Sequence, residues 1–125
     1  MPILNQPFSE TFGSDSFGSL GDLFLKEISK SGYTELCIFS AFAKNSGVLR
    51  IKNALLDFKK NGGKIFAFVG IDLQWTSKEA LEALFRICDF LVVVHSSRNS
   101  QTFHSKIYYL EGAKDYWYAV GSNNL

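Results

Sequence analysis

The sequence predicts an α/β fold in which helices flank a mixed, mostly parallel sheet that ends in a β-hairpin. Two observations carry this prediction. Short apolar runs alternate with segments of helical periodicity between residues 17 and 96, which is the pattern of βαβ units. Two more strand-like runs then follow one another with only a short turn between them. Apolar residues make up 46% of the 125 residues and charged residues 20%, as expected for one globular domain.

The first third of the chain is expected to contain a lead-in, a helix and a strand. Residues 1–15 form a loosely structured lead-in. A helix is expected from Phe17 to Lys30, where Ser31-Gly32 stops it. Its apolar stripe consists of Leu20, Leu23, Phe24 and Ile28. The apolar run at 34–42 is expected to be a buried strand.

Two helix–strand pairs are expected next. Ser46 is a suitable cap for a helix that runs to Lys60 and ends at Asn61-Gly62-Gly63. The inner stripe of this helix consists of Val48, Ile51, Leu55 and Phe58. A strand at 64–71 follows. Thr76-Ser77-Lys78-Glu79 has the spacing of a capping box, which predicts a third helix to Ile87 and then a strand at 89–96.

The last two strands are expected to form a hairpin, at 102–112 and 115–122, with a turn near Gly112-Ala113-Lys114. Because the chain stops at Leu125, directly after this strand, we expect residues 1–125 to be a single domain that forms the N-terminal part of a longer protein. Five aromatic residues around the hairpin could pack in the core or stack on single-stranded bases: Tyr108, Tyr109, Tyr116, Trp117 and Tyr118.

Charge and cysteine content exclude several classes of protein. The net charge of +1 excludes a strongly basic protein that wraps nucleic acid. Residues 44–64 nevertheless carry a local charge of +5, which is either a solvated helix face or a patch that attracts phosphate through Lys44, Arg50 and Lys52. Cys37 and Cys88 lie in apolar runs without a CxxC motif. We therefore expect buried free thiols, with a reactive thiol or a disulfide as the alternative, no zinc site and a cytoplasmic protein.

Membrane and cofactor signals are missing from the sequence. No apolar run approaches the ~18 residues of a membrane-spanning helix, and the first residues do not form a signal peptide. The sequence also lacks a P-loop, a dinucleotide-binding glycine motif, a GxSxG motif and clustered carboxylates. We therefore expect no cofactor, no metal and no membrane partner.

The two strands of the hairpin carry polar residues that suit a phosphodiester. On a strand, His104 and Lys106 project to the same face. The partner strand ends in Gly121-Ser122-Asn123-Asn124. A neutral imidazole can attack phosphorus, an ammonium can bind its non-bridging oxygens, and hydroxyl and amide groups can donate to them. Each half of the set alone is a weak signal, because a single histidine is usually structural and GSNN is an ordinary turn.

Together these residues resemble a known motif. His104-x-Lys106 followed by Gly121-Ser122-x-Asn124 resembles the HxK…GSxN signature of the phospholipase D superfamily, and the flanks FHSKIYYLEG and YAVGSNNL resemble its nuclease and restriction-endonuclease branch. The resemblance covers residues 34–125. It implies a phospholipase D-like fold and a metal-independent reaction in which His104 forms a phosphohistidine. It also implies that Lys106 and Asn124 hold the phosphate oxygens, with help from Ser122.

The sequence departs from the family pattern in two respects. Glu111 stands where the family has aspartate, and nine residues rather than six then separate it from Gly121. Asp115 is a second candidate for the supporting acid, at a different offset. The family site uses two motifs, whereas this chain holds one, because His95 lacks a lysine two residues later. The resemblance therefore implies a homodimer with two motifs at the interface, or a second motif downstream.

These observations lead to one principal expectation and two alternatives. The principal expectation is a phosphodiesterase that cleaves DNA as a restriction-like endonuclease. One alternative is a non-catalytic DNA-binding or dimerisation module with the same fold. The weaker alternative is a phospholipase or phosphatidyltransferase, for which the sequence offers no amphipathic membrane-binding segment.

Overall fold

The computed structural model describes residues 15–71, 76–95 and 107–120, and for residues 15–20 it describes the backbone alone. Eight elements follow one another in the order α-β-α-β-α-β-β-β, as predicted. The helices are α1 (Asp15–Ile28), α2 (Asn45–Lys60) and α3 (Lys78–Ile87). The strands are β1 (Tyr33–Ser40), β2 (Lys64–Gly70), β3 (Phe90–Val94), β4 (Ile107–Gly112) and β5 (Tyr116–Val120).

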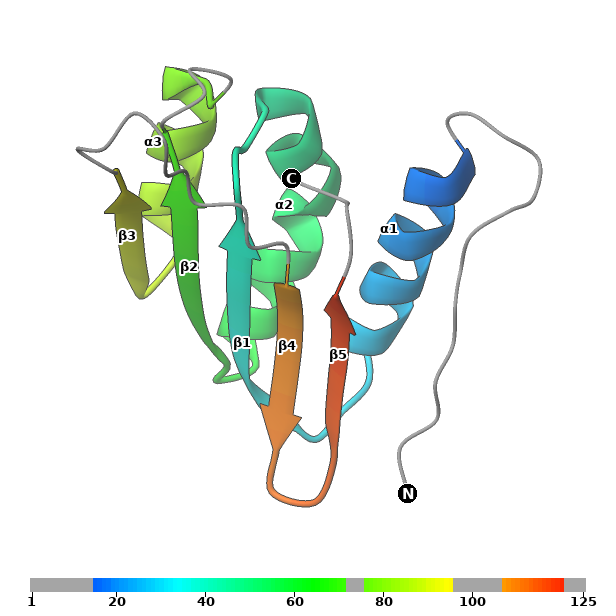
Figure 1. The fold of residues 1–125 in the computed structure, drawn as a ribbon. Helices are drawn as coiled ribbons and strands as arrows, with labels where there is room; N and C mark the ends of the chain where they lie inside the picture. Colours follow the sequence, from blue (N-terminus) through cyan, green and yellow to red (C-terminus); the bar gives the residue numbers. More distant parts are fainter. Residues whose placement is uncertain (1–14, 72–75, 96–106, 121–125) are drawn as a thin grey trace.

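The five strands form one mixed sheet in the order β3-β2-β1-β4-β5 (Figure 1). β1, β2 and β3 are parallel, whereas β4 pairs antiparallel with both β1 and β5. The prediction of a mixed α/β sheet is confirmed. The sheet is not mostly parallel, however, because parallel and antiparallel pairings are equal in number. The difference arises at β4, which lies beside β1 and not beyond β3.

The helices of the described chain lie on one face of the sheet (Figure 1). The core between them contains Leu36 and Ile38 of β1, Ile65 of β2 and Leu110 of β4, all with no exposed surface. Right-handed connections explain the arrangement. The chain steps from β1 to β2 to β3 in one direction across the sheet, so α2 and α3 arrive on the same face.

The opposite face of the sheet, here called the open face, is not covered by any of the described elements. Alternate residues of all five strands project from it, and Phe90 is 63% and Val120 68% exposed. The apolar residues of the open face are Cys37, Phe39, Phe66, Phe68, Phe90, Val92, Val94, Ile107, Tyr109, Tyr116, Tyr118 and Val120. Tyr108 and Trp117 project to the helix side instead, where both rings contact Phe24.

The C-terminal end of α2 agrees with the prediction from the sequence, whereas its N-terminal end differs from it. The apolar stripe of α2 is buried as predicted, and the helix ends in a Schellman motif. Gly62, at φ 93°, donates to the Lys59 carbonyl, and Gly63 donates to the Phe58 carbonyl. The predicted cap at Ser46 is wrong. Lys44 is the N-cap residue and has extended backbone angles, while Ser46 already lies inside the helix, where it cannot cap.

The predicted capping box of α3 is also displaced by one residue. Ser77 is the N-cap, and its side chain accepts from the Ala80 N–H at 3.1 Å. The Thr76 hydroxyl makes other bonds, described below. The two cysteines are free thiols, as predicted, but both are only partly buried. Cys37 lies on the open face, and Cys88 ends α3.

Candidate functional site

The edge of the sheet where β1, β2 and β3 end is the place to which the predicted motif is attached. Ile107, the first residue of β4, pairs with Phe39 near the end of β1 and with Val120, the last residue of β5. Lys106 directly precedes Ile107, and Gly121 directly follows Val120. The hairpin therefore places Ile107 and Val120 side by side at the carboxyl edge of the parallel strands. The two halves of the motif are attached to these two residues.

The motif residues themselves, His104, Lys106, Ser122 and Asn124, lie outside the described residues. What the structure establishes is the scaffold to which they are joined. In open α/β sheets, ligands bind beyond the carboxyl ends of the strands. The described strand ends to which the predicted motif residues are joined thus lie at the edge where open α/β sheets bind ligands.

Hydrogen bonds from Thr76 connect the loops at this edge. Its hydroxyl donates to the Gly70 carbonyl at 2.7 Å and accepts from the Ala43 N–H at 3.0 Å. The Ser77 N–H donates to the Ala43 carbonyl at 3.0 Å. One threonine therefore holds the end of β2, the start of α3 and the loop before α2 together. The sequence placed Thr76 in a capping-box pattern and did not predict that it would connect these loops.

Ser40 and Tyr108 hold β1 and β4 in place beneath the same edge. Ser40 is fully buried, and its hydroxyl donates to the Phe42 carbonyl at 2.7 Å. Burial raises the pKa of Tyr108, and a hydrogen bond with Ser40 opposes this shift. The phenol therefore stays neutral at physiological pH. Both groups support the start of β4, one residue from Lys106.

The two candidates for a supporting acid lie at the other end of the hairpin. Glu111 pairs with Tyr116 beside the turn, and the Gly112 N–H donates to the Asp115 carbonyl within it. Four residues of extended strand, roughly 13 Å, separate Ile107 from Glu111. The structure thus does not bring Glu111 or Asp115 to the carboxyl edge. Glu111 instead contributes to raising the pKa of Tyr109, after burial, which is the larger cause.

The three predicted phosphate-attracting residues lie at different places along α2. Lys44 precedes the helix at the carboxyl edge, with its ammonium 5.9 Å from the centre of the Phe42 ring. Arg50 makes an ion pair with Asp22 of α1 at 3.2 Å, and Lys52 is exposed. Among these three residues, only Lys44 stands where a ligand at the carboxyl edge would be.

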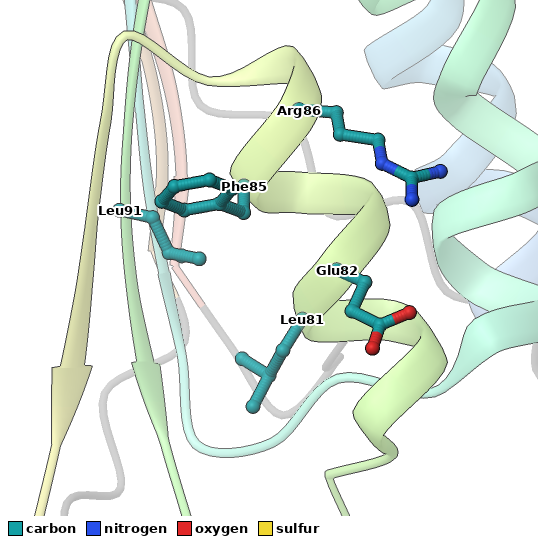
Figure 2. A pocket seen from close by; sticks show the side chains of 5 residues that line it. All are labelled: Leu81, Glu82, Phe85, Arg86 and Leu91. Atoms are coloured by element: carbon teal, nitrogen blue, oxygen red, sulfur yellow. The ribbon is translucent and has the colours of Figure 1, made fainter.

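A shallow pocket of about 500 Å³ lies on the helix face of the sheet, between α3 and the edge strand β3 (Figure 2). Phe85 and Leu91 point toward one another across it, and Leu81 extends its apolar wall (Figure 2). Glu82 and Arg86 also line it and extend from the side of α3 that faces away from β3 (Figure 2). None of the predicted site residues lines this pocket, and most of its surface is apolar.

The described part of the chain contains no group of three or more histidine, cysteine or acidic residues that could hold a metal ion. None of its helices is both long and apolar enough to cross a membrane. The sequence matches no model of a known protein family and no curated protein.

Proposed function

We propose that this chain is a metal-independent phosphodiesterase that cleaves DNA, an endonuclease of the phospholipase D type that acts in the cytoplasm. The observation that supports the proposal most is the pairing of Ile107 with Val120. This pairing joins the HxK and GSxN halves of the motif to adjacent strand ends. The fold class supports it as well, since a mixed α/β sheet is what the resemblance implies.

The proposed reaction proceeds in two displacements. The neutral imidazole of His104 attacks phosphorus, so a P–N bond forms while the P–O bond to the leaving strand breaks. Lys106 and Asn124 hold the non-bridging oxygens, and Ser122 assists them. A histidine from a second motif protonates the leaving oxygen. It then removes a proton from the water that attacks phosphorus and releases His104.

The second motif is proposed to come from another copy of the chain. The 125-residue sequence holds one HxK motif, at His104 to Lys106. Two copies would supply the nucleophilic histidine and the proton-donating histidine. DNA is proposed as the substrate because the segment 44–64 is basic, and because Lys44 stands at the carboxyl edge, where it can attract a phosphate backbone.

Cleavage of supercoiled plasmid in excess EDTA tests this proposal. We expect the wild-type chain to convert the plasmid to nicked and linear forms, and His104→Ala to lose this activity by at least about 10³-fold. His95→Ala is the matched control, because His95 is an exposed histidine that follows β3 and has no place in the proposed reaction. It should cleave at the wild-type rate.

DNA binding separates the proposal from a non-catalytic module with the same fold. If the wild-type chain binds duplex DNA in a fluorescence-anisotropy titration but cleaves none, the non-catalytic module is the better conclusion. If His104→Ala cleaves as fast as the wild-type chain, the proposed mechanism is wrong. Preference for phospholipid vesicles over DNA in a competition experiment would overturn the choice of substrate.

A further inference from the structure

The open face of the sheet carries five of the exposed large apolar residues of the described chain, namely Phe90, Val92, Tyr116, Tyr118 and Val120. Sheets with parallel strands are normally covered on both faces, because unpaired apolar surface is costly in water. Here α2 and α3 share one face with α1 (Figure 1). Contiguous exposed apolar patches on a folded protein mark sites of association. The question is which occupant the open face fits.

The register of the strands arranges the open face in straight rows. One row crosses the whole sheet and consists of Phe90, Phe66, Cys37, Tyr109 and Tyr118. The next row runs from Val92 to Val120 and contains Phe39 and Phe68. These two rings are stacked at 4.7 Å with an interplanar angle of 6°. The stacked rings belong to neighbouring strands, so they join β1 and β2 into one continuous apolar row.

A charged row lies at the edge of this surface, at the end of the sheet opposite the predicted motif. Glu35 of the central strand β1 has Lys64 of β2 on one side and Glu111 of β4 on the other. Glu35 and Glu111 are like charges at paired positions, which is unfavourable in an isolated sheet. Their charge contributes to raising the pKa of Cys37, after burial, which is the larger cause. A positive charge facing Glu111 would relieve this repulsion.

We propose that two copies of this chain pack open face against open face, around a two-fold axis that runs along β1. Such an axis reverses the order of the strands, so β2 of one copy faces β4 of the other. Lys64 of each copy then faces Glu111 of the second copy, twice per dimer. Glu35 lies close to the axis with Lys64 of its own sheet beside it. The apolar rows meet between the two sheets, roughly 10 Å apart.

The size of the open face sets the strength of the expected dimer. Five strands at about 4.8 Å spacing and five residues at about 3.3 Å give a flat area of roughly 400 Å² per copy. The two copies together would bury about 800 Å², which is below the ~1,200–2,000 Å² of stable specific interfaces and in the range of weak, transient ones. We therefore expect a dimer with a dissociation constant in the micromolar range, whose population depends on protein concentration.

The axis has a consequence for the proposed nuclease. Because it runs along the strands, the carboxyl edges of both sheets lie at the same end of the dimer. Both copies then present their motif-bearing hairpins at that end. The inference deepens the proposed homodimer but rests on the open face alone, and its tests use no DNA. A failed cleavage experiment therefore leaves it standing. A dimer that forms through another surface would overturn it and leave the proposed chemistry standing, whereas a monomeric chain would also remove the second copy as the source of the second motif.

Charge reversal in the charged row tests the proposed contact between Lys64 of one copy and Glu111 of the other. Lys64→Glu places two glutamates opposite each other at both contacts of a dimer, and Glu111→Lys does the same with lysines. Sedimentation equilibrium from about 1 to 200 μM should show each variant alone dimerising at least about 10-fold more weakly than the wild-type chain. An equimolar mixture of the two variants restores both opposite-charge contacts, so it should dimerise like the wild-type chain. Circular dichroism checks that each variant is folded.

Cross-linking of Cys37 tests the position of the axis. Sheets about 10 Å apart exceed the Cα–Cα distance of a disulfide, ~4.4–6.8 Å, so a bis-maleimide with a short spacer is the suitable reagent. We expect a covalent dimer from the wild-type chain and none from Cys37→Ser, which keeps Cys88.

Two results would overturn the proposal. One is a chain that stays monomeric across the whole concentration range, in which case helices from elsewhere, and not a second copy, cover the open face. The other is a dimer that neither charge reversal weakens and that Cys37 does not cross-link. Such a dimer would form along an exposed sheet edge, β3 or β5, and not through the open face.

Discussion

Replacing Thr76 by valine removes both hydrogen bonds that connect the loops at the carboxyl edge while keeping the shape of the side chain. The lost bonds are those to the Gly70 carbonyl at 2.7 Å and from the Ala43 N–H at 3.0 Å. A protein hydrogen bond contributes about 1 kcal/mol net, and a partly buried N–H left without an acceptor adds a further cost. We expect Thr76→Val to lower the free energy of unfolding by about 2–3 kcal/mol.

Urea denaturation followed by circular dichroism measures this loss, and Thr76→Ser is the matched control. Serine keeps the hydroxyl and loses one methyl group, so its cost should stay below about 1 kcal/mol. Hydrogen exchange gives a local readout. The Ala43 amide should exchange faster in Thr76→Val than in Thr76→Ser, whereas the amides of the β2 interior should change only with global stability.

Two results would refute the reasoning. A loss below about 0.5 kcal/mol in Thr76→Val would mean that water replaces the hydroxyl at little cost. Equal losses in the valine and serine variants would mean that the methyl group, and not the hydrogen bonds, stabilises this edge.

Three further predictions concern stability and thiol chemistry. Leu110→Ala should lower the free energy of unfolding by about 2–5 kcal/mol, and Leu56→Ala by less than about 1 kcal/mol, because Leu110 is fully buried and Leu56 is 43% exposed. Equal losses in urea titrations would contradict the packing described. Gly112→Ala should cost at least ~1–3 kcal/mol by the same assay, because its methyl group would overlap the backbone carbonyl of Gly32; an unchanged midpoint would show that the backbone adapts. Burial raises the pKa of Cys88 from its ordinary 9.0 to about 12, so its contribution to stability is present below pH 9 and is lost as pH rises toward 12. Cys88→Ala should therefore show a flatter loss of stability between pH 9 and 11 than the wild-type chain, and parallel curves would contradict the shift.

The sequence predicted the elements well where periodicity and buried contacts agree. The stripe Val48, Ile51, Leu55 and Phe58 marked α2 because its helical spacing coincides with the face that meets the sheet. The N-cap residues of the helices were less predictable, because several nearby side chains can accept a hydrogen bond from the same backbone N–H group. Ser46 has a suitable side chain but lies two residues after the cap position, which Lys44 takes without a side-chain hydrogen bond.

Long-range arrangement was the harder part to predict. The residues around Ile107 carry no sequence signal that β4 pairs with β1, so the sheet was expected to be mostly parallel. The same limit applies to the site. The sequence indicated that the hairpin joins the motif halves, but the distance of Glu111 from the carboxyl edge became visible only with the register. The one-sided covering of the sheet follows from the direction of the crossovers, which no residue type encodes.

The antiparallel contact between β1 and β4 also has a kinetic consequence. β1, β2 and β3 are linked through short helical connections. Phe39 of β1, in contrast, pairs with Ile107 of β4, and α2, β2, α3 and β3 all lie between them along the chain. Contacts between residues far apart along the chain form slowly, because loop closure costs entropy before the contact repays it. We expect the hairpin to dock last during folding and to detach first in partial unfolding. The proposed catalytic residues would then be assembled only when the whole sheet is complete, so a partly folded chain would be inert toward DNA.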